Sequence, residues 1–219
     1  MRKQLAFLTV SIASICFASA GSANNFDPQT VSPSALVSIV DDSGKQGVAR
    51  LFRDNNGVSY DIVTTGLDPD RVYTVWALIF NNPRACINAS LTEVTPGQQC
   101  DLGDLANPDT RPGVVWTTGG FTNAAGVANF NARIARFDGS VEAPFPFAQN
   151  PLLDPRRSEI QLVVRFHPGA SGDDEAASLG ADLLSQLTTF NGGCEADGAC
   201  ADVQLSVHRP AAARPPAGN

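Results

Sequence analysis

Residues 58–64 read VSYDIVT, and this pattern is the best guide to the fold of the 219-residue chain. Val58, Tyr60 and Ile62 alternate with polar Ser59 and Asp61, as in a strand with one face in a core and the other in water. The same alternation recurs in residues 128–134, 159–166 and 203–207. Four half-buried strands are therefore predicted from alternation alone.

Less regular apolar runs lie between these segments, at residues 35–40, 48–53, 72–80 and 114–118. The run 72–80, VYTVWALIF, is apolar on both faces, as expected of a central strand that is covered on two sides. Residues rich in Gly, Asn and Asp separate the runs and favour turns. Eight short strands predict an all-β sandwich or barrel, with one helix predicted in residues 173–187.

The ends of the chain are unlike its middle. Arg2 and Lys3 precede an apolar stretch at residues 5–17 and the small residues Ala18-Ser19-Ala20, which is the pattern of a secretory signal peptide. We place the cleavage after Ala20, and we expect a secreted or periplasmic protein. The predicted organisation is a signal peptide at 1–20, a linker at 21–34, one β-domain at 35–208 and a flexible Pro/Ala-rich tail at 209–219.

Charge narrows the range of partners. The chain has 15 basic and 22 acidic residues, and its formal net charge is −7. An acidic surface disfavours nucleic acid and anionic lipid headgroups. No apolar run long enough to span a membrane remains after the signal is removed. We therefore predict neither a nucleic-acid partner nor a membrane span in the mature chain.

Four cysteines remain after the signal: Cys86, Cys100, Cys194 and Cys200. Export favours disulfides, and four cysteines allow three pairings. Because closing a short loop costs less entropy, we favour Cys86 with Cys100 and Cys194 with Cys200. No Cys-x-x-Cys spacing supports zinc or redox catalysis.

Three long connections, at residues 81–112, 136–158 and 168–201, separate the predicted strands. Consecutive strands of a sandwich run in opposite directions, so its connections alternate between the two ends. The first two long connections should share one end with the turn at residues 54–57, and the third should lie at the other end. Long connections of this kind carry function or are tethered.

The titratable residues give no catalytic motif. His167 and His208 fall on the predicted polar faces of their strands, about 20 Å apart at 3.3 Å per residue, so we expect two surface histidines and no shared metal. Asp101, Asp104, Asp109 and Asp154 fall at the end with two long connections, and we expect a solvated acidic loop there. Two of them could serve a carboxylate hydrolase, or several could bind calcium. No cofactor is predicted.

Rigid aromatic rings beside amides and guanidinium groups suit a binding surface. The end of the sandwich with the two long connections carries side chains of both kinds. Phe145 and Phe147 have an alternative role, which is to plug the open end of the core. The predicted ligand-binding residues are Asn81, Asn82, Arg84, Phe145, Phe147 and Arg156.

Residues 66–75, GLDPDRVYTV, resemble the Leu-x-Pro-x-x-x-Tyr signature of fibronectin type III and related immunoglobulin-like sandwiches. The resemblance implies that the Tyr73 hydroxyl bonds to nearby backbone. From residue 66 to 208 the chain also resembles secreted bacterial proteins of unassigned activity. The shared residues are Trp76, FNNP at 80–83, Cys86, LDPR at 153–156, VVR at 163–165, His167 and NGGC at 191–194.

These observations predict an exported immunoglobulin-like antiparallel β-sandwich of about eight strands with long, disulfide-tethered loops. We expect a non-catalytic binding or structural module at the cell surface, in the periplasm or outside the cell. Its ligand would be an extracellular or envelope polysaccharide or protein. The alternatives are the carboxylate-based hydrolase and the calcium-stabilised adhesion-type module.

Overall fold

The computed structural model describes residues 30–38, 46–87, 100–137, 151–167 and 200–211. Its strands are β1 (Thr30–Ser38), β2 (Gln46–Asp54), β3 (Gly57–Thr65), β4 (Val72–Phe80), β5 (Pro112–Phe121), β6 (Ala128–Ala135), β7 (Glu159–His167) and β8 (Ala201–His208). Three short 3-10 helices lie between β4 and β5: η1 (Pro83–Ala85), η2 (Leu102–Ala106) and η3 (Pro108–Thr110). The predicted helix at 173–187 and the signal peptide lie outside the described residues.

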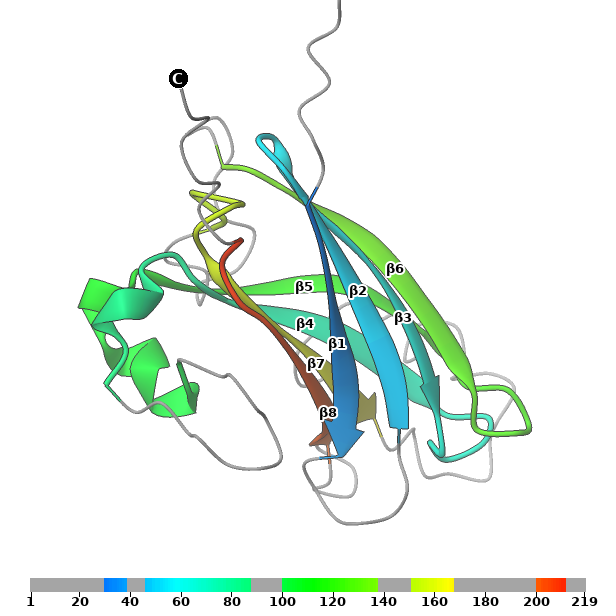
Figure 1. Cartoon of the computed structure of the whole chain (residues 1–219). Coiled ribbons are helices and arrows are strands. Elements are labelled where there is room, and N and C mark those ends of the chain that lie inside the picture. Colours follow the sequence, from blue (N-terminus) through cyan, green and yellow to red (C-terminus); the bar gives the residue numbers. More distant parts are fainter. Residues whose placement is uncertain (1–29, 39–45, 88–99, 138–150, 168–199, 212–219) are drawn as a thin grey trace, which may run out of the picture.

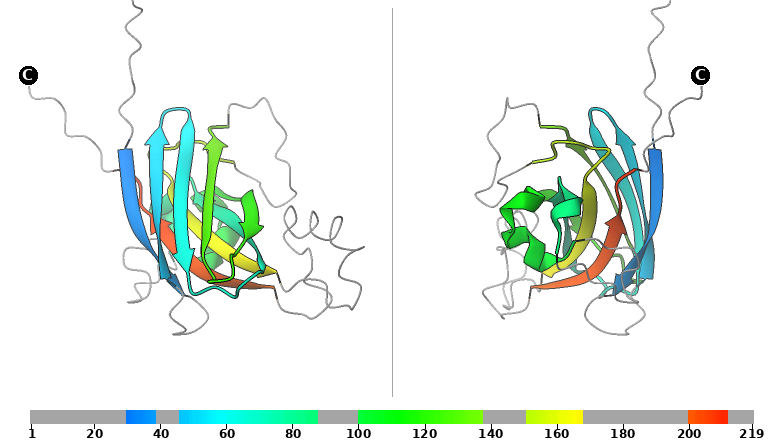
Figure 2. Two further views of the ribbon diagram at one scale, coloured as in Figure 1. Left: turned by 90° about the vertical axis from the view of Figure 1, so that its right-hand side faces the viewer. Right: turned by 60° about the vertical axis from the view of Figure 1, so that its left-hand side comes forward.

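The strands form two antiparallel layers that face each other (Figure 1). The first layer has the order β1-β2-β3-β6 and the second has the order β5-β4-β7-β8. The layers are joined where the end of β1 pairs with β8 through Val37–Leu205 and Ser38–Gln204. Figure 2 shows them from two further directions. The prediction of an all-β antiparallel sandwich is confirmed.

The main core lies between the layers. Val58, Tyr60 and Ile62 are at most 1% exposed, while Asp61 is exposed on the other face of β3, as the alternation predicted. Burying each such large apolar side chain stabilises the fold by about 1.5–3 kcal/mol. The main core is therefore built from the inner faces of strands whose sequence already marked those faces.

The outer face of the second layer is also covered. Trp76, Leu78 and Phe80 of β4 form a second apolar cluster with Val163, Leu205 and Cys100. All nine residues of β4 are buried. The prediction that residues 72–80 form a strand covered on both sides is confirmed.

The corner between β3 and β4 is held by local bonds. The Tyr73 hydroxyl accepts a hydrogen bond from the Asp68 amide at 3.0 Å, as the resemblance implied, and burial raises the pKa of Tyr73 to about 12. Leu67 of this corner donates its amide to the Gly126 carbonyl at 3.1 Å. Gly126 has φ 67°, and a Cβ at this position would collide with the Leu67 carbonyl oxygen.

Both ends of the predicted domain extend further than the sequence indicated. β1 begins at Thr30, five residues before the predicted start at residue 35. Pro33 is compatible with this strand because β8 pairs only with its last two residues, so much of β1 has a neighbour on one side alone. At the other end, Ala211 of the predicted flexible tail donates its amide to the Arg156 carbonyl at 2.8 Å.

Candidate functional site

The predicted end of the sandwich is assembled as expected. Arg136 donates its amide to the Asn56 carbonyl at 2.8 Å, which joins the 136–158 connection to the turn between β2 and β3. Asn81 donates from its side chain to the Pro151 carbonyl at 3.2 Å, which joins the two long connections. The turn and the described parts of both connections therefore meet at one end of the molecule.

Asn81 holds this end together. Its amide nitrogen donates to the Arg111 and Pro151 carbonyls, and its oxygen accepts from the Leu153 amide at 2.9 Å and the Ser158 hydroxyl at 3.0 Å. These four bonds use the donors and acceptors of the side chain. Asn81, predicted to bind ligand, is thus engaged within the protein.

The other predicted binding residues divide into two groups. Arg156 is half-buried and donates to the Asn55 side chain at 2.9 Å and to the Thr30 hydroxyl at 3.2 Å, so it fastens the chain's first strand to this end. Asn82 and Arg84 are exposed, although Asn82 also donates to the Asp109 carbonyl. Phe145 and Phe147 lie outside the described residues.

The disulfide between Cys86 and Cys100 is confirmed, with the two Cα atoms 5.1 Å apart. The Cys100 amide donates to the Glu159 carboxylate at 3.2 Å, and its carbonyl accepts from the Gln161 side chain at 2.6 Å. The bridge is thereby attached to the outer face of β7. Of the other predicted pair only Cys200 is described, because Cys194 lies outside the described residues.

The predicted solvated acidic loop is wrong for Asp104, which is fully buried. Its carboxylate accepts from the amides of Ile87 and Asp101, both at 3.0 Å, while Asp101 caps the start of η2. Asp154 likewise accepts from the amides of the two residues at 156 and 157. These carboxylates fix turns by accepting backbone N–H groups.

One group of possible metal ligands brings Cys86, Cys100 and Asp104 within 4.8 Å of one another. The two sulfur atoms are bonded to each other, so neither is a thiolate that could hold zinc. The cluster therefore belongs to the framework of this end.

Arg53 was not singled out from the sequence, yet it is fully buried at this end. Its guanidinium donates to the carbonyls of Pro155, Ser158, His208 and Arg209 at 2.5–3.0 Å. Burial lowers the pKa of Arg53 to about 10, so the group stays protonated at neutral pH. The alternation did contain a signal, because residues 49, 51 and 53 share the inner face of β2.

The prediction of surface histidines is wrong: His167 is 0% exposed and His208 is 1% exposed. His167 Nε2 lies 2.8 Å from the Thr74 hydroxyl, which also accepts from the Trp76 indole at 3.0 Å. This histidine does lie on the outer face of β7, but that face is covered. The two histidines lie at opposite ends of β7, where His167 is beside Val72 and the partner of His208 is Ile160.

His208 is buried because β8 presents its polar side chains to the interior. A bulge between Val164 and Arg165 shifts the register of β7 and β8. His208 Nδ1 lies 3.0 Å from the Ser32 carbonyl, and Nε2 lies 3.2 Å from the Ser206 hydroxyl. Burial, and secondarily the charge of Arg53, lowers the pKa of His208 to about 4.

Among the described residues, no helix has the length and apolar character needed to cross a membrane. No family model, curated protein or solved structure matches this chain.

Proposed function

We propose that the chain is an exported, non-catalytic binding module that presents its ligand surface at one end of an immunoglobulin-like sandwich. The surface is the disulfide platform, which consists of residues 81–87 and 100–111. The observation that carries the proposal is the way this platform is fixed: a disulfide and several side-chain bonds hold a non-sheet segment rigidly against β7.

Rigidity matters because binding by a mobile loop costs conformational entropy, whereas a fixed loop has lost that entropy on folding. The buried Asp104 carboxylate joins the two halves of the platform through the Ile87 amide. Asn107 adds a second link, because its side chain donates to the Ala85 carbonyl at 3.0 Å. The platform therefore keeps its shape without a ligand.

The outward side chains of the platform suit an amphipathic ligand. Ile87 is 80% exposed and Leu102 is 64% exposed, so both offer apolar surface to a partner. Arg84 and Arg111 are also exposed. A polysaccharide or protein with both apolar and anionic groups would match this combination.

The carboxylates of the platform favour binding over hydrolysis as its role. A glycoside hydrolase needs one carboxyl group as a proton donor and another as a base or nucleophile. Asp104 is instead fully buried, and its carboxylate accepts two backbone amides, so it belongs to the framework of the platform and is not presented to a ligand.

Ligand capture would test the proposal. The mature protein, immobilised, is incubated with polysaccharides and with cell-envelope extracts, and retained material is quantified. The variants Arg84→Ala and Ile87→Ser should each lower capture at least about tenfold, as expected when a central contact is lost. Phe121→Ser, at the end of β5 opposite the platform, is the control and should capture normally.

Unaltered capture by both platform variants would assign binding to another surface. Turnover of a captured polysaccharide would contradict the non-catalytic part of the proposal.

A further inference from the structure

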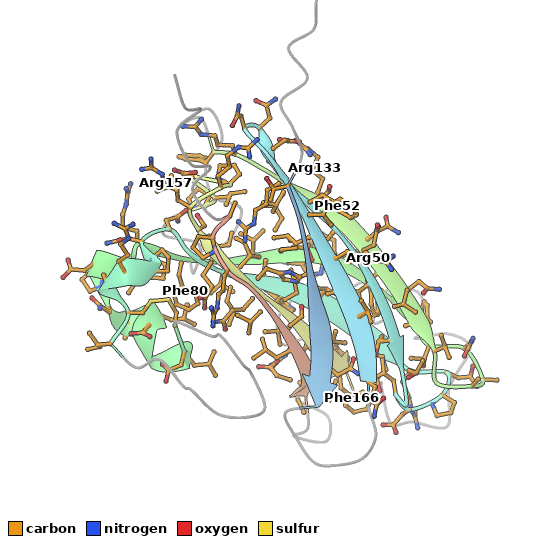
Figure 3. The ribbon with its side chains drawn as sticks, in the orientation of Figure 1. Arg50, Phe52, Phe80, Arg133, Arg157 and Phe166 are labelled. Carbon is orange, nitrogen blue, oxygen red and sulfur yellow. A yellow bond between two sulfur atoms is a disulfide. The ribbon has the colours of Figure 1, made fainter. Side chains whose placement is uncertain are left out.

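The outer face of the first layer is open to solvent and carries large apolar side chains. Val48 of β2 is 47% exposed and Val63 of β3 is 52% exposed. Phe52 is half-buried on the same face of β2. Figure 3 labels Phe52 and Arg50 on this layer. The face is separate from the disulfide platform, which is attached to the second layer.

The side chains of this face form matched rows across β2 and β3. Neighbouring strands place paired residues on the same face, so each row has one member from each strand. The rows are Gln46–Thr65, Val48–Val63, Arg50–Asp61 and Phe52–Ser59. Two of these rows are central: one is apolar in both strands, and the other has opposite charges.

This arrangement is self-complementary. A twofold axis that runs parallel to the strands, between β2 and β3, places β2 of one copy over β3 of the other. Each row then meets the same row of the second copy, with its β2 and β3 members exchanged. Val48 faces Val63 of the second copy, and Arg50 faces Asp61 of the second copy, so the same two contacts occur twice, as in an isologous interface.

Arg50 and Asp61 are available for such contacts. Both are exposed, and within the described parts of the chain they make no ion pair of 4 Å or less with each other. Arg133 on the neighbouring strand differs, because both of its terminal nitrogens lie 3.1 Å from the Asp54 carboxylate. A second copy would supply Arg50 and Asp61 with partners in a partly desolvated interface, where charge complementarity orients the two molecules.

The area of the face determines how strongly two copies are expected to associate. Four strands about 4.8 Å apart and seven residues long at about 3.4 Å each cover about 500 Å² per copy. The total of about 1,000 Å² is at the lower limit for a specific interface. We infer that two copies of this chain associate face to face through β2 and β3, as a weak dimer with a dissociation constant in the micromolar range.

The test is sedimentation equilibrium of the mature full-length chain at about 1–200 μM, in low salt. Arg50→Asp should raise the dissociation constant at least about tenfold, because two acidic groups then face each other twice. Asp61→Arg should do the same. These variants change net charge in opposite directions, so weakening by both cannot arise from overall repulsion.

The double variant Arg50→Asp/Asp61→Arg restores opposite charges across the axis, and it should recover the wild-type dissociation constant within about threefold. Arg71→Asp is the matched control, because Arg71 is exposed in the loop before β4, away from this face. A wild-type protein that stays monomeric at 200 μM overturns the inference. So does a double variant that is as weak as the single variants, since the copies would then use another geometry.

Discussion

His208 makes the stability of the domain depend on pH in a way that can be measured. Its imidazole is buried between Ser32 and Ser206, and its pKa is lowered to about 4 by burial and by Arg53. The unfolded chain has an ordinary histidine with a pKa of about 6.5. Below pH 6.5 the unfolded chain therefore binds a proton that the folded chain excludes.

The direction and size of the effect follow from this difference. Stability due to neutral His208 is fully present above pH 6.5 and is lost as pH falls towards 4, where the folded protein also binds the proton. A shift of two to three pKa units corresponds to about 3 kcal/mol, at about 1.4 kcal/mol per unit. This is a large part of the stability of a typical domain.

The assay is urea unfolding of the protein without residues 1–20, and of its His208→Gln variant, at pH 7.5, 6.5, 5.5, 4.5 and 4.0. The pKa of Asp54 is lowered mainly by its hydrogen bond from Arg133, so protonation of Asp54 in acid also lowers the unfolding free energy. This contribution is the same in both proteins. The difference in unfolding free energy between wild type and variant isolates His208. It should shrink by about 3 kcal/mol between pH 7.5 and 4.0, because only the wild type has the histidine. A difference that stays constant with pH would refute the burial of a neutral imidazole.

Three further substitutions test the framework, each by urea unfolding at pH 7. Arg53→Met removes the donor from four carbonyls, three of them in buried bonds, and should cost about 3–5 kcal/mol; a loss below about 1 kcal/mol would contradict the role of Arg53. Gly126→Ala places a methyl group on a left-handed backbone against the Leu67 carbonyl, so the unfolding free energy should fall by more than about 2 kcal/mol. An unchanged unfolding free energy would contradict the close contact between Gly126 and Leu67. The double variant Cys86→Ala/Cys100→Ala releases a loop whose ends are 14 residues apart and should cost about 3 kcal/mol. Reducing the wild type with a dithiol should also lower its stability, and an unchanged stability would contradict the role of the disulfide.

The layered architecture could be predicted because alternation records which side chains are buried. β3 shows this directly, since Tyr60 and Ile62 face the core and Asp61 faces water. The run at 72–80 also carried its own signal, because a strand that is apolar on both faces needs a cover on each side. The cover itself, supplied in part by the disulfide platform, could not be inferred from β4 alone.

β8 shows why alternation misled. Leu205 and Val207 were assigned to the core, but they pack in or against the outer cluster, while Gln204 and Ser206 are buried. The Thr64 hydroxyl donates to the Gln204 side chain across the main core at 2.5 Å. Polar residues can occupy a core when they find partners, and a single sequence does not reveal partners that lie 140 residues away.

The sequence predicted the position of the candidate site better than it predicted the roles of its side chains. Counting strands placed the two long connections and the β2–β3 turn at one end, and the hydrogen bonds among them confirm this placement. Asn81 was predicted to bind a ligand because its amide falls at the same end as aromatic rings and guanidinium groups. Its four internal bonds depend on chain segments brought together only by folding.

The four carbonyls around Arg53 have a consequence for the order in which the domain can form. Two of them, at residues 208 and 209, are separated from Arg53 by 155 and 156 positions. While the polypeptide emerges from the ribosome, the arginine is made well before β8, and two of its four acceptors follow only when β8 has been made. A nascent chain that stops short of β8 would have to enclose a cation with half of its acceptors missing, so the segment that contains Arg53 has reason to stay open until β8 has been made.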